Sequence, residues 1–175
     1  MKTRKAVPRV SDIYLLNDRL NQLIIKSLDP AAWRAPAPGP RARTIAAIFA
    51  HMHNMRRKWV RLSAPDLKLP PPLNRNICSQ KETAAALAES AILCSELLTE
   101  AESGRISHFH RDGWAKPWHG TGPAMLAYML THEAHHRGQV CMLAHQLGFK
   151  LPIQAAYGMW NWEKLWRECG FLPPL

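Results

Sequence analysis

The sequence predicts an all-α fold: a four-helix bundle with long connections and a short C-terminal helix, in a single domain over residues 1–175. Four long segments place apolar residues three and four positions apart, which is the spacing of one helical face. The 14 prolines fall mostly between those segments, as expected of residues that break helices. No segment alternates with the period of two that indicates a strand.

The first two helices are separated by a proline-rich connection. The first is expected at about 10–28, where Ile13 and Leu16 begin one apolar face. The second is expected at about 44–62, and Thr44 is a suitable N-cap because its hydroxyl can accept a hydrogen bond from the first turn.

The third and fourth helices have recognisable ends. The third is expected at about 79–102, because Ser79 followed by Glu82 matches the capping box that begins many helices. The fourth is expected at about 123–147, with Gly148 as its stop.

Two segments complete the chain. The stretch 105–122 is rich in histidine, tryptophan and glycine and is expected to be irregular. A short helix at about 158–169 carries Trp162 and Trp166 at helical spacing. We expect it to cover the bundle, with a dimer contact as the alternative.

Composition restricts the class of protein. An excess of 23 Lys and Arg over 13 Asp and Glu gives a net charge of +10, which could attract nucleic acid. The basic residues are dispersed and accompany no known recognition motif, so we do not expect nucleic-acid binding. No apolar run reaches the length of a membrane span or of a secretory signal. The four cysteines form no CxxC pair, which predicts reduced thiols in a cytoplasmic protein.

The fourth helix carries the clearest chemical pattern, in the run THEAHHRGQ. His132 and His136 are four residues apart, so their side chains lie one turn apart on the same face and can bind one metal ion. Both lie on the apolar stripe, which predicts that they face the bundle interior. His135 lies about 100° around the helix, so we expect it at the rim. There, His135 and Arg137 could orient the ligands or contact an anion.

A third ligand is expected from the second helix, where the run AHMHN contains His51 and His53. Residues two positions apart on a helix point in widely different directions, so only one of the two can face inward. His51 lies one turn from Ile48 and Met55 on the apolar stripe, whereas His53 lies on a more basic face. We therefore choose His51 as the ligand, with His53 as the alternative.

Three imidazoles that leave a coordination position open are typical of a catalytic metal site. Zinc, nickel, iron and cobalt ions all accept such ligands. The competing interpretation is that the histidines are hydrogen-bonded core residues without a metal, which is the usual role of a single buried histidine.

The same run satisfies H-E-x-x-H, the zinc-protease signature, in which Glu133 would activate a water on the metal. The extended signature needs a glycine and a histidine where this chain has Gln139 and Met142, and no sheet is expected beside the helix. A protease is therefore a minor alternative. Glu133 is expected at the surface or beside the ligands, where it could orient a neighbouring group.

Three segments, TIAAIFAHMHNMRRKW, HEAHHRGQ and YGMWNWEKLW, together resemble the DinB/YfiT-like superfamily of metal-dependent four-helix bundles over about 10–168. The resemblance implies an up-down-down-up bundle with a long second connection, often as a homodimer. It also implies a divalent metal ion bound by His51, His132 and His136. Nickel or zinc is expected first, with iron, cobalt or manganese as alternatives.

The resemblance further implies a function. Relatives include transferases that use low-molecular-weight thiols and a maleylpyruvate isomerase, and many others have no established activity. A metal ion in such a site stabilises a thiolate nucleophile or activates water. We therefore expect a metal-dependent thiol transferase or hydrolase acting on a small molecule. The alternative is a DNA-damage-related or stress-related binding protein, or a structural bundle without catalysis.

Overall fold

The computed structural model describes residues 8–110, 113 and 118–171, so both ends of the domain expected over 1–175 lie outside the described residues. Four long helices form the body of the protein: α1 (Val10–Ser27), α2 (Ile45–Ser63), α3 (Gln80–Glu102) and α4 (Gly122–Gln146). The all-α prediction is confirmed, and each long helix begins and ends within two residues of its expected bounds. Among the described helices, none is long and apolar enough to cross a membrane.

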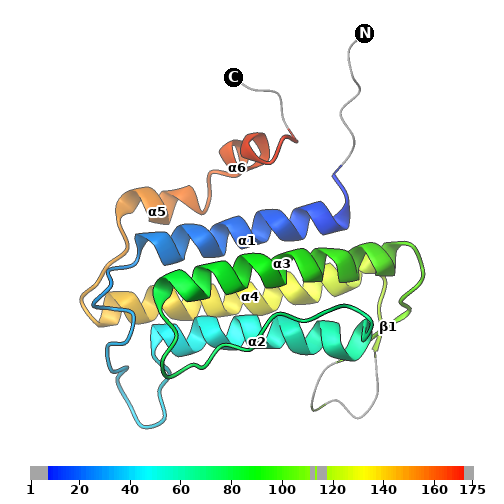
Figure 1. The fold of residues 1–175 in the computed structure, drawn as a ribbon. Helices are drawn as coiled ribbons and strands as arrows, with labels where there is room; N and C mark the ends of the chain where they lie inside the picture. The colour runs from blue at the N-terminus through cyan, green and yellow to red at the C-terminus, as the bar shows by residue number, and fades with distance from the viewer. Residues whose placement is uncertain (1–7, 111–112, 114–117, 172–175) are drawn as a thin grey trace.

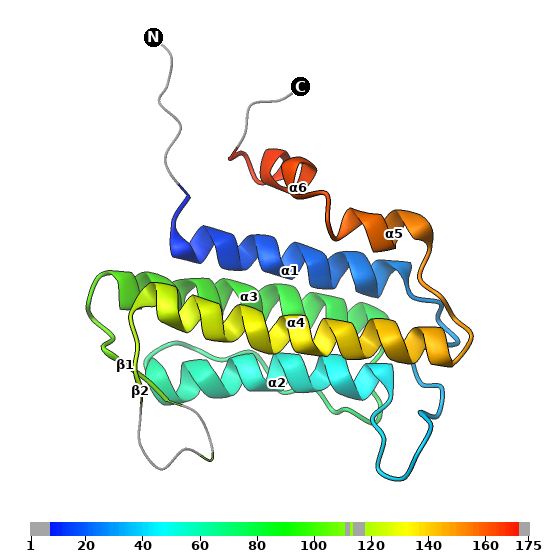
Figure 2. The same cartoon turned by 180° about the vertical axis from the view of Figure 1, so that it is seen from behind.

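The four long helices pack side by side, with α3 and α4 between α1 and α2 (Figure 1). α1 and α4 run in one direction and α2 and α3 in the other, so the chain order is up-down-down-up (Figures 1 and 2). Because α2 and α3 are parallel, residues 64–79 must return along the bundle between them. This is the long second connection that the resemblance implies.

Local sequence explains where the helices begin and end. Thr44 caps α2 by accepting a hydrogen bond from the backbone N–H three residues further on, and Ser79 and Glu82 form the predicted capping box at α3. Gly104 and Gly148 follow α3 and α4 with φ angles of 76° and 84°. Residues with a side chain rarely adopt this left-handed backbone, which is why glycine ends these helices.

Polar side chains divide the core of the bundle into two apolar parts. One part contains the C-terminal half of α1, the N-terminal half of α2 and the C-terminal half of α4, and includes Ile24, Phe49 and Val140. The other part lies toward the opposite end of the bundle and includes Trp59 and Met129. Between them, all four helices contribute buried polar residues. A polar layer therefore crosses the middle of the bundle.

The C-terminal tail differs from the single helix that the spacing predicts for 158–169. The structure has two short helices, α5 (Ile153–Gly158) and α6 (Trp162–Glu168), and Asn161 caps the second by accepting a hydrogen bond from a backbone N–H. α6 buries Leu165 against Leu16 and Leu20 of α1. The tail therefore covers the bundle as expected, but in two pieces.

The stretch between α3 and α4 contains a small hairpin where the sequence predicts irregular structure. Strands β1 (His108–Phe109) and β2 (Trp118–His119) pair antiparallel, with His108 opposite His119. Strands of two residues are too short to produce a detectable alternation. The Phe109 and Trp118 rings pack edge to face with their centroids 6.1 Å apart.

Candidate metal centre

Three histidines from two helices converge at the interface of α2 and α4. His51 comes from α2, and His132 and His136 come from consecutive turns of α4. Their ligand atoms all lie within 4.8 Å of one another, and the Nε2 atoms of His132 and His136 are 3.2 Å apart. The structure thus contains a three-histidine cluster that could hold a metal ion. Its members are the three residues chosen from the sequence.

The ring nitrogens of His132 and His136 have the spacing that a shared cation requires. Zinc–nitrogen bonds of about 2.0–2.1 Å at tetrahedral angles place two ligating nitrogens about 3.3 Å apart, close to the distance between His132 and His136. Burial lowers the pKa of His136, which favours the neutral ring that a metal ion requires. Neutral nitrogen donors suit several first-row divalent ions.

Neighbouring side chains orient two of the three rings. Oε1 of Gln139 lies 2.7 Å from Nδ1 of His136. Nδ1 therefore carries the hydrogen, and Nε2 directs its lone pair toward the cluster. Trp59 packs edge to face against His132, with the ring centroids 5.0 Å apart. These contacts position the rings of His136 and His132.

His53 lies outside the cluster. Its Nδ1 is 3.1 Å from the hydroxyl of Ser90 on α3, and its Nε2 is 3.0 Å from the carbonyl oxygen of Pro71 in the long connection. His53 is fully buried, whereas His51 is partly exposed. The structure supports His51 as the cluster member. The expectation that His51 is the inward-facing member of the pair and that His53 lies on a more basic face is wrong. His53 is fully buried against Ser90 of α3, whereas His51 is partly exposed beside His132 and His136 of α4.

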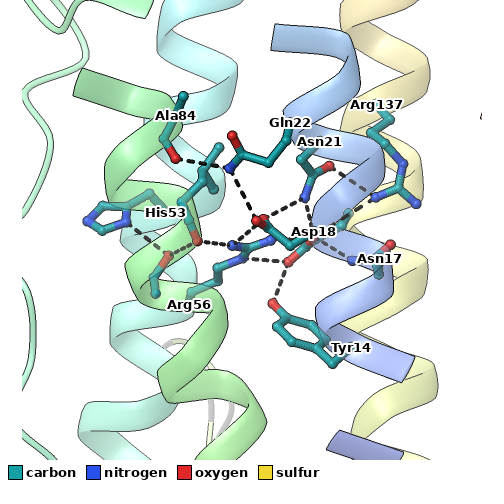
Figure 3. A network of polar contacts seen from close by, with 12 residues as sticks. Tyr14, Asn17, Asp18, Asn21, Gln22, His53, Arg56, Ala84 and Arg137 are labelled. Carbon is teal, nitrogen blue, oxygen red and sulfur yellow. Dashed lines mark hydrogen bonds and ion pairs between the residues drawn. The ribbon is translucent and has the colours of Figure 1, made fainter. Parts of the chain in front are cut away.

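A network of buried charges lies in the interior beside the cluster (Figure 3). Arg56 of α2 donates from Nε and Nη2 to the two carboxylate oxygens of Glu133 on α4, at 2.7 and 2.8 Å. Its Nη1 donates to Asp18 of α1 at 2.9 Å and to the backbone carbonyl of Leu87 on α3 at 2.7 Å. Arg56 and Glu133 are fully buried. One guanidinium therefore joins all four long helices.

Glu133 accepts three further hydrogen bonds, all from α1. Tyr14 donates to Oε1 at 2.5 Å, and Asn17 and Asn21 donate to Oε2 at 2.7 and 2.8 Å. Burial alone would raise the pKa of Glu133, but the Arg56 charge and the hydrogen bonds from Arg56, Tyr14 and Asn21 lower it to about 2. Glu133 is therefore a fixed anion at neutral pH.

This environment corrects the expectation that Glu133 lies at the surface, because its side chain is fully buried, and it argues against a protease. The carboxylate faces α1, and each of its oxygens accepts at least two hydrogen bonds. A general base needs a pKa near the working pH, whereas the pKa of Glu133 is about 2. The H-E-x-x-H spacing is present, but its glutamate stabilises the bundle interior.

The remaining two candidate residues have different surroundings. His135 is exposed at the rim as expected, and its ring lies 5.1 Å from that of His136. Arg137 is partly buried; its Nη1 donates to Asn21 at 3.1 Å and lies 3.9 Å from the Glu133 carboxylate. Arg137 therefore extends the buried network toward α1, where Asn21 lies (Figure 3).

The buried network is the part of the site that sequence reasoning misses. On α1, Tyr14, Asn17, Asn21 and Ile24 follow one another at steps of three and four, and all are buried. This spacing marks a second interior-facing stripe beside the apolar one. Counting polar residues at helical spacing, as well as apolar ones, would find it.

Two surface hollows lie near the cluster, and His51 lines one of them. One has a volume of about 630 Å³ and is lined in part by His135 and Gln139 of α4. The other has a volume of about 440 Å³ and is lined in part by His51 and by residues of the long connection. Arg43, just before α2, lines both.

Comparison with known proteins assigns the chain to a family. The family model described as the DinB family matches residues 14–167, which include all three clustered histidines and the four long helices except the first few residues of α1. A search of the curated proteins finds no significant match. The model covers most of the chain, and the helix order agrees with the bundle that the resemblance implies. The chain therefore belongs to the DinB family.

Proposed function

We propose that this protein binds one divalent metal ion through His51, His132 and His136 and uses it as a thiol transferase or hydrolase acting on a small molecule. The observation that carries the proposal is the convergence of three imidazoles from α2 and α4, with their ligand atoms within 4.8 Å of one another. Three protein ligands leave a coordination position for a substrate, which is the pattern of catalytic sites.

The ion would supply one kind of chemistry, because a bound cation lowers the pKa of a thiol or water that it contacts. The protein's own residues prepare the site for it. Gln139 holds His136 with Nε2 toward the cluster, and Trp59 limits the rotation of the His132 ring. The Arg56–Glu133 pair joins α2 to α4, so the two helices that supply the ligands are fixed relative to each other.

Nickel or zinc is the proposed ion. Both accept neutral imidazole nitrogens, whereas magnesium and calcium prefer oxygen ligands. The surroundings support a neutral donor set, since burial lowers the pKa of His136 and none of the residues found within the cluster is a carboxylate or thiol.

Elemental analysis of protein purified without a histidine tag tests the proposal. The wild type should contain a divalent metal at close to one ion per chain, and His51→Ala and His132→Ala should each lose at least nine-tenths of it. His53→Ala should keep its metal, because His53 hydrogen-bonds to Ser90 and Pro71 instead. His145→Ala, an exposed residue of α4, is the matched control.

Three results would count against all or part of the proposal. Equal metal content in His132→Ala and the wild type would show that the cluster does not hold the ion. Loss of metal in His53→Ala alone would assign the ligand on α2 to the other histidine. If the metal binds but raises the melting temperature without turnover of any thiol or ester substrate, its role is structural.

A further inference from the structure

The two hollows near the histidine cluster are both lined by positively charged side chains, which a metal site alone does not require. The larger, of about 630 Å³, lies between the segment preceding α2 and the C-terminal half of α4. The smaller, of about 440 Å³, lies between α2 and the long connection. His51 lines the smaller hollow, and Gln139, which holds His136, lines the larger. The smaller hollow therefore includes one of the proposed ligands, and the larger includes a residue that contacts another of them.

The charged side chains of these hollows have one sign. Arg43 lines both, and Lys58 and Arg75 line the smaller one. Among the described residues that line either hollow, no aspartate or glutamate is present. Within the described part of the chain, neither Arg43 nor Arg75 forms an ion pair with a carboxylate. Among the described residues, the charges of Arg43 and Arg75 are thus not neutralised by a carboxylate of the protein.

Polar and apolar lining are arranged in a way that suits an organic molecule. In the smaller hollow, the amides of Asn54, Asn74 and Asn76 accompany the charged groups. In the larger hollow, Ile48, Met142 and Leu143 add apolar surface. The smaller hollow also contains Met55 and Leu73, and the larger also contains Gln139 and Gln146, so each combines polar groups with apolar surface. This is the usual composition of a small-molecule site.

We propose that the substrate of the metal centre is a small organic anion, whose carboxylate or phosphate group is bound by Arg43 and Arg75. This inference rests on the proposed function and adds the substrate class to it. A guanidinium presents parallel N–H donors that match the oxygens of these groups, so arginine binds them more specifically than lysine does. Two hollows lined by positive charge also raise the local concentration of anions. The long second connection has a role in this arrangement, because it carries Arg75 to the side of α2 where His51 lies.

Isothermal titration with three probes tests the inference on full-length protein, both as purified and after removal of metal by a chelator. The probes are succinate, inorganic phosphate and succinamide, the neutral counterpart of succinate. Arg43→Gln and Arg75→Gln should each weaken binding of the anion by about tenfold, the effect of losing about one charge-assisted hydrogen bond. Lys81→Gln, which removes the same charge from an exposed position of α3 outside both hollows, should leave binding unchanged.

The outcomes separate the two proposals. Binding of either anion that both arginine variants weaken, with no binding of succinamide, supports the inference; the better-bound probe decides between carboxylates and phosphates. Equal affinity for succinate and succinamide overturns it. Anion affinity that is the same in the wild type and in both arginine variants also overturns it. Metal content and melting temperature are measured on the same samples. If the protein holds metal but shows no arginine-dependent anion binding, the proposed function stands and this inference is overturned. If the protein holds no metal but binds the anion through the arginines, the proposed function is overturned and the anion site stands.

Discussion

Replacing Glu133 by glutamine removes one negative charge from the centre of the bundle while keeping the size of the side chain. The carboxylate accepts five hydrogen bonds, two from Arg56 and one each from Tyr14, Asn17 and Asn21. Oε1 accepts two of them and Oε2 accepts three. Wherever the amide NH₂ of glutamine is placed, it therefore faces at least two other donors. Arg56 keeps its ion pair with Asp18 but loses the carboxylate that accepts two of its hydrogen bonds.

The structure sets the size of the effect. Removing one partner of a buried ion pair costs about 3–5 kcal/mol, because the remaining charge stays buried. The fall of the Glu133 pKa from 4.5 to about 2 on folding corresponds independently to about 3 kcal/mol. For a chain of this length, a loss of about 3–5 kcal/mol lowers the melting temperature by roughly 6–20 °C.

Urea unfolding at pH 7, followed by tryptophan fluorescence, measures the change. Glu89→Gln is the control, because Glu89 is an exposed residue of α3 and its replacement removes the same charge. If Glu133→Gln unfolds at the same urea concentration as this control, the carboxylate contributes nothing to stability and our account of the interior is refuted. A catalytic glutamate would give that result, with unchanged stability and lost activity.

Acid should destabilise the bundle through the same carboxylate. Because the pKa of Glu133 is lowered from 4.5 to about 2 in the folded protein, its contribution is complete above about pH 4.5 and is lost as the pH falls through 2; urea unfolding between pH 5 and 2 should show this loss, and Glu133→Gln should flatten it. Gln139→Ala should weaken metal binding about 10–100-fold, because His136 loses the acceptor that fixes its ring. Competition with a chelator measures the affinity, and a value equal to that of Gln146→Ala, an exposed change on the same helix, would contradict the prediction. Burial raises the pKa of Cys94 to about 12, so a thiol reagent at pH 8 should label it only after unfolding; mass spectrometry measures the labelling, and a rate equal to that of the partly exposed Cys141 would be the opposite result.

The helices were accessible to sequence reasoning because each signal is local. Thr44, Ser79 and Gly148 act on backbone groups within one turn of themselves, so their residue types alone indicate where helices begin and end. The pair His132 and His136 is local in the same sense, since i and i+4 share a face on any helix. These parts of the fold and of the cluster needed no knowledge of which helices are neighbours.

The orientation of α2 and the buried network were not accessible in this way. Arg56 lies between Met52 and Val60 on the buried side of α2. From the sequence alone, a charged residue at such a position indicates an exposed face, because the partners that allow its burial are not known. Those partners are on three other helices and at distant positions in the chain. The same limit explains His53, whose burial depends on Ser90 and Pro71.

The guanidinium that joins all four helices also decides how α2 can move along its own axis. Sliding α2 by one turn, about 5.4 Å, would withdraw Arg56 from both carboxylates and push it into one of the two apolar parts of the core. An unpaired charge there costs several kcal/mol, so the helix is locked in a single longitudinal setting. His51 is on the same helix, so it stays at the same height along the bundle axis as His132 and His136. The two helices that supply the ligands are therefore aligned before an ion binds, which reduces the free-energy cost of ordering the site.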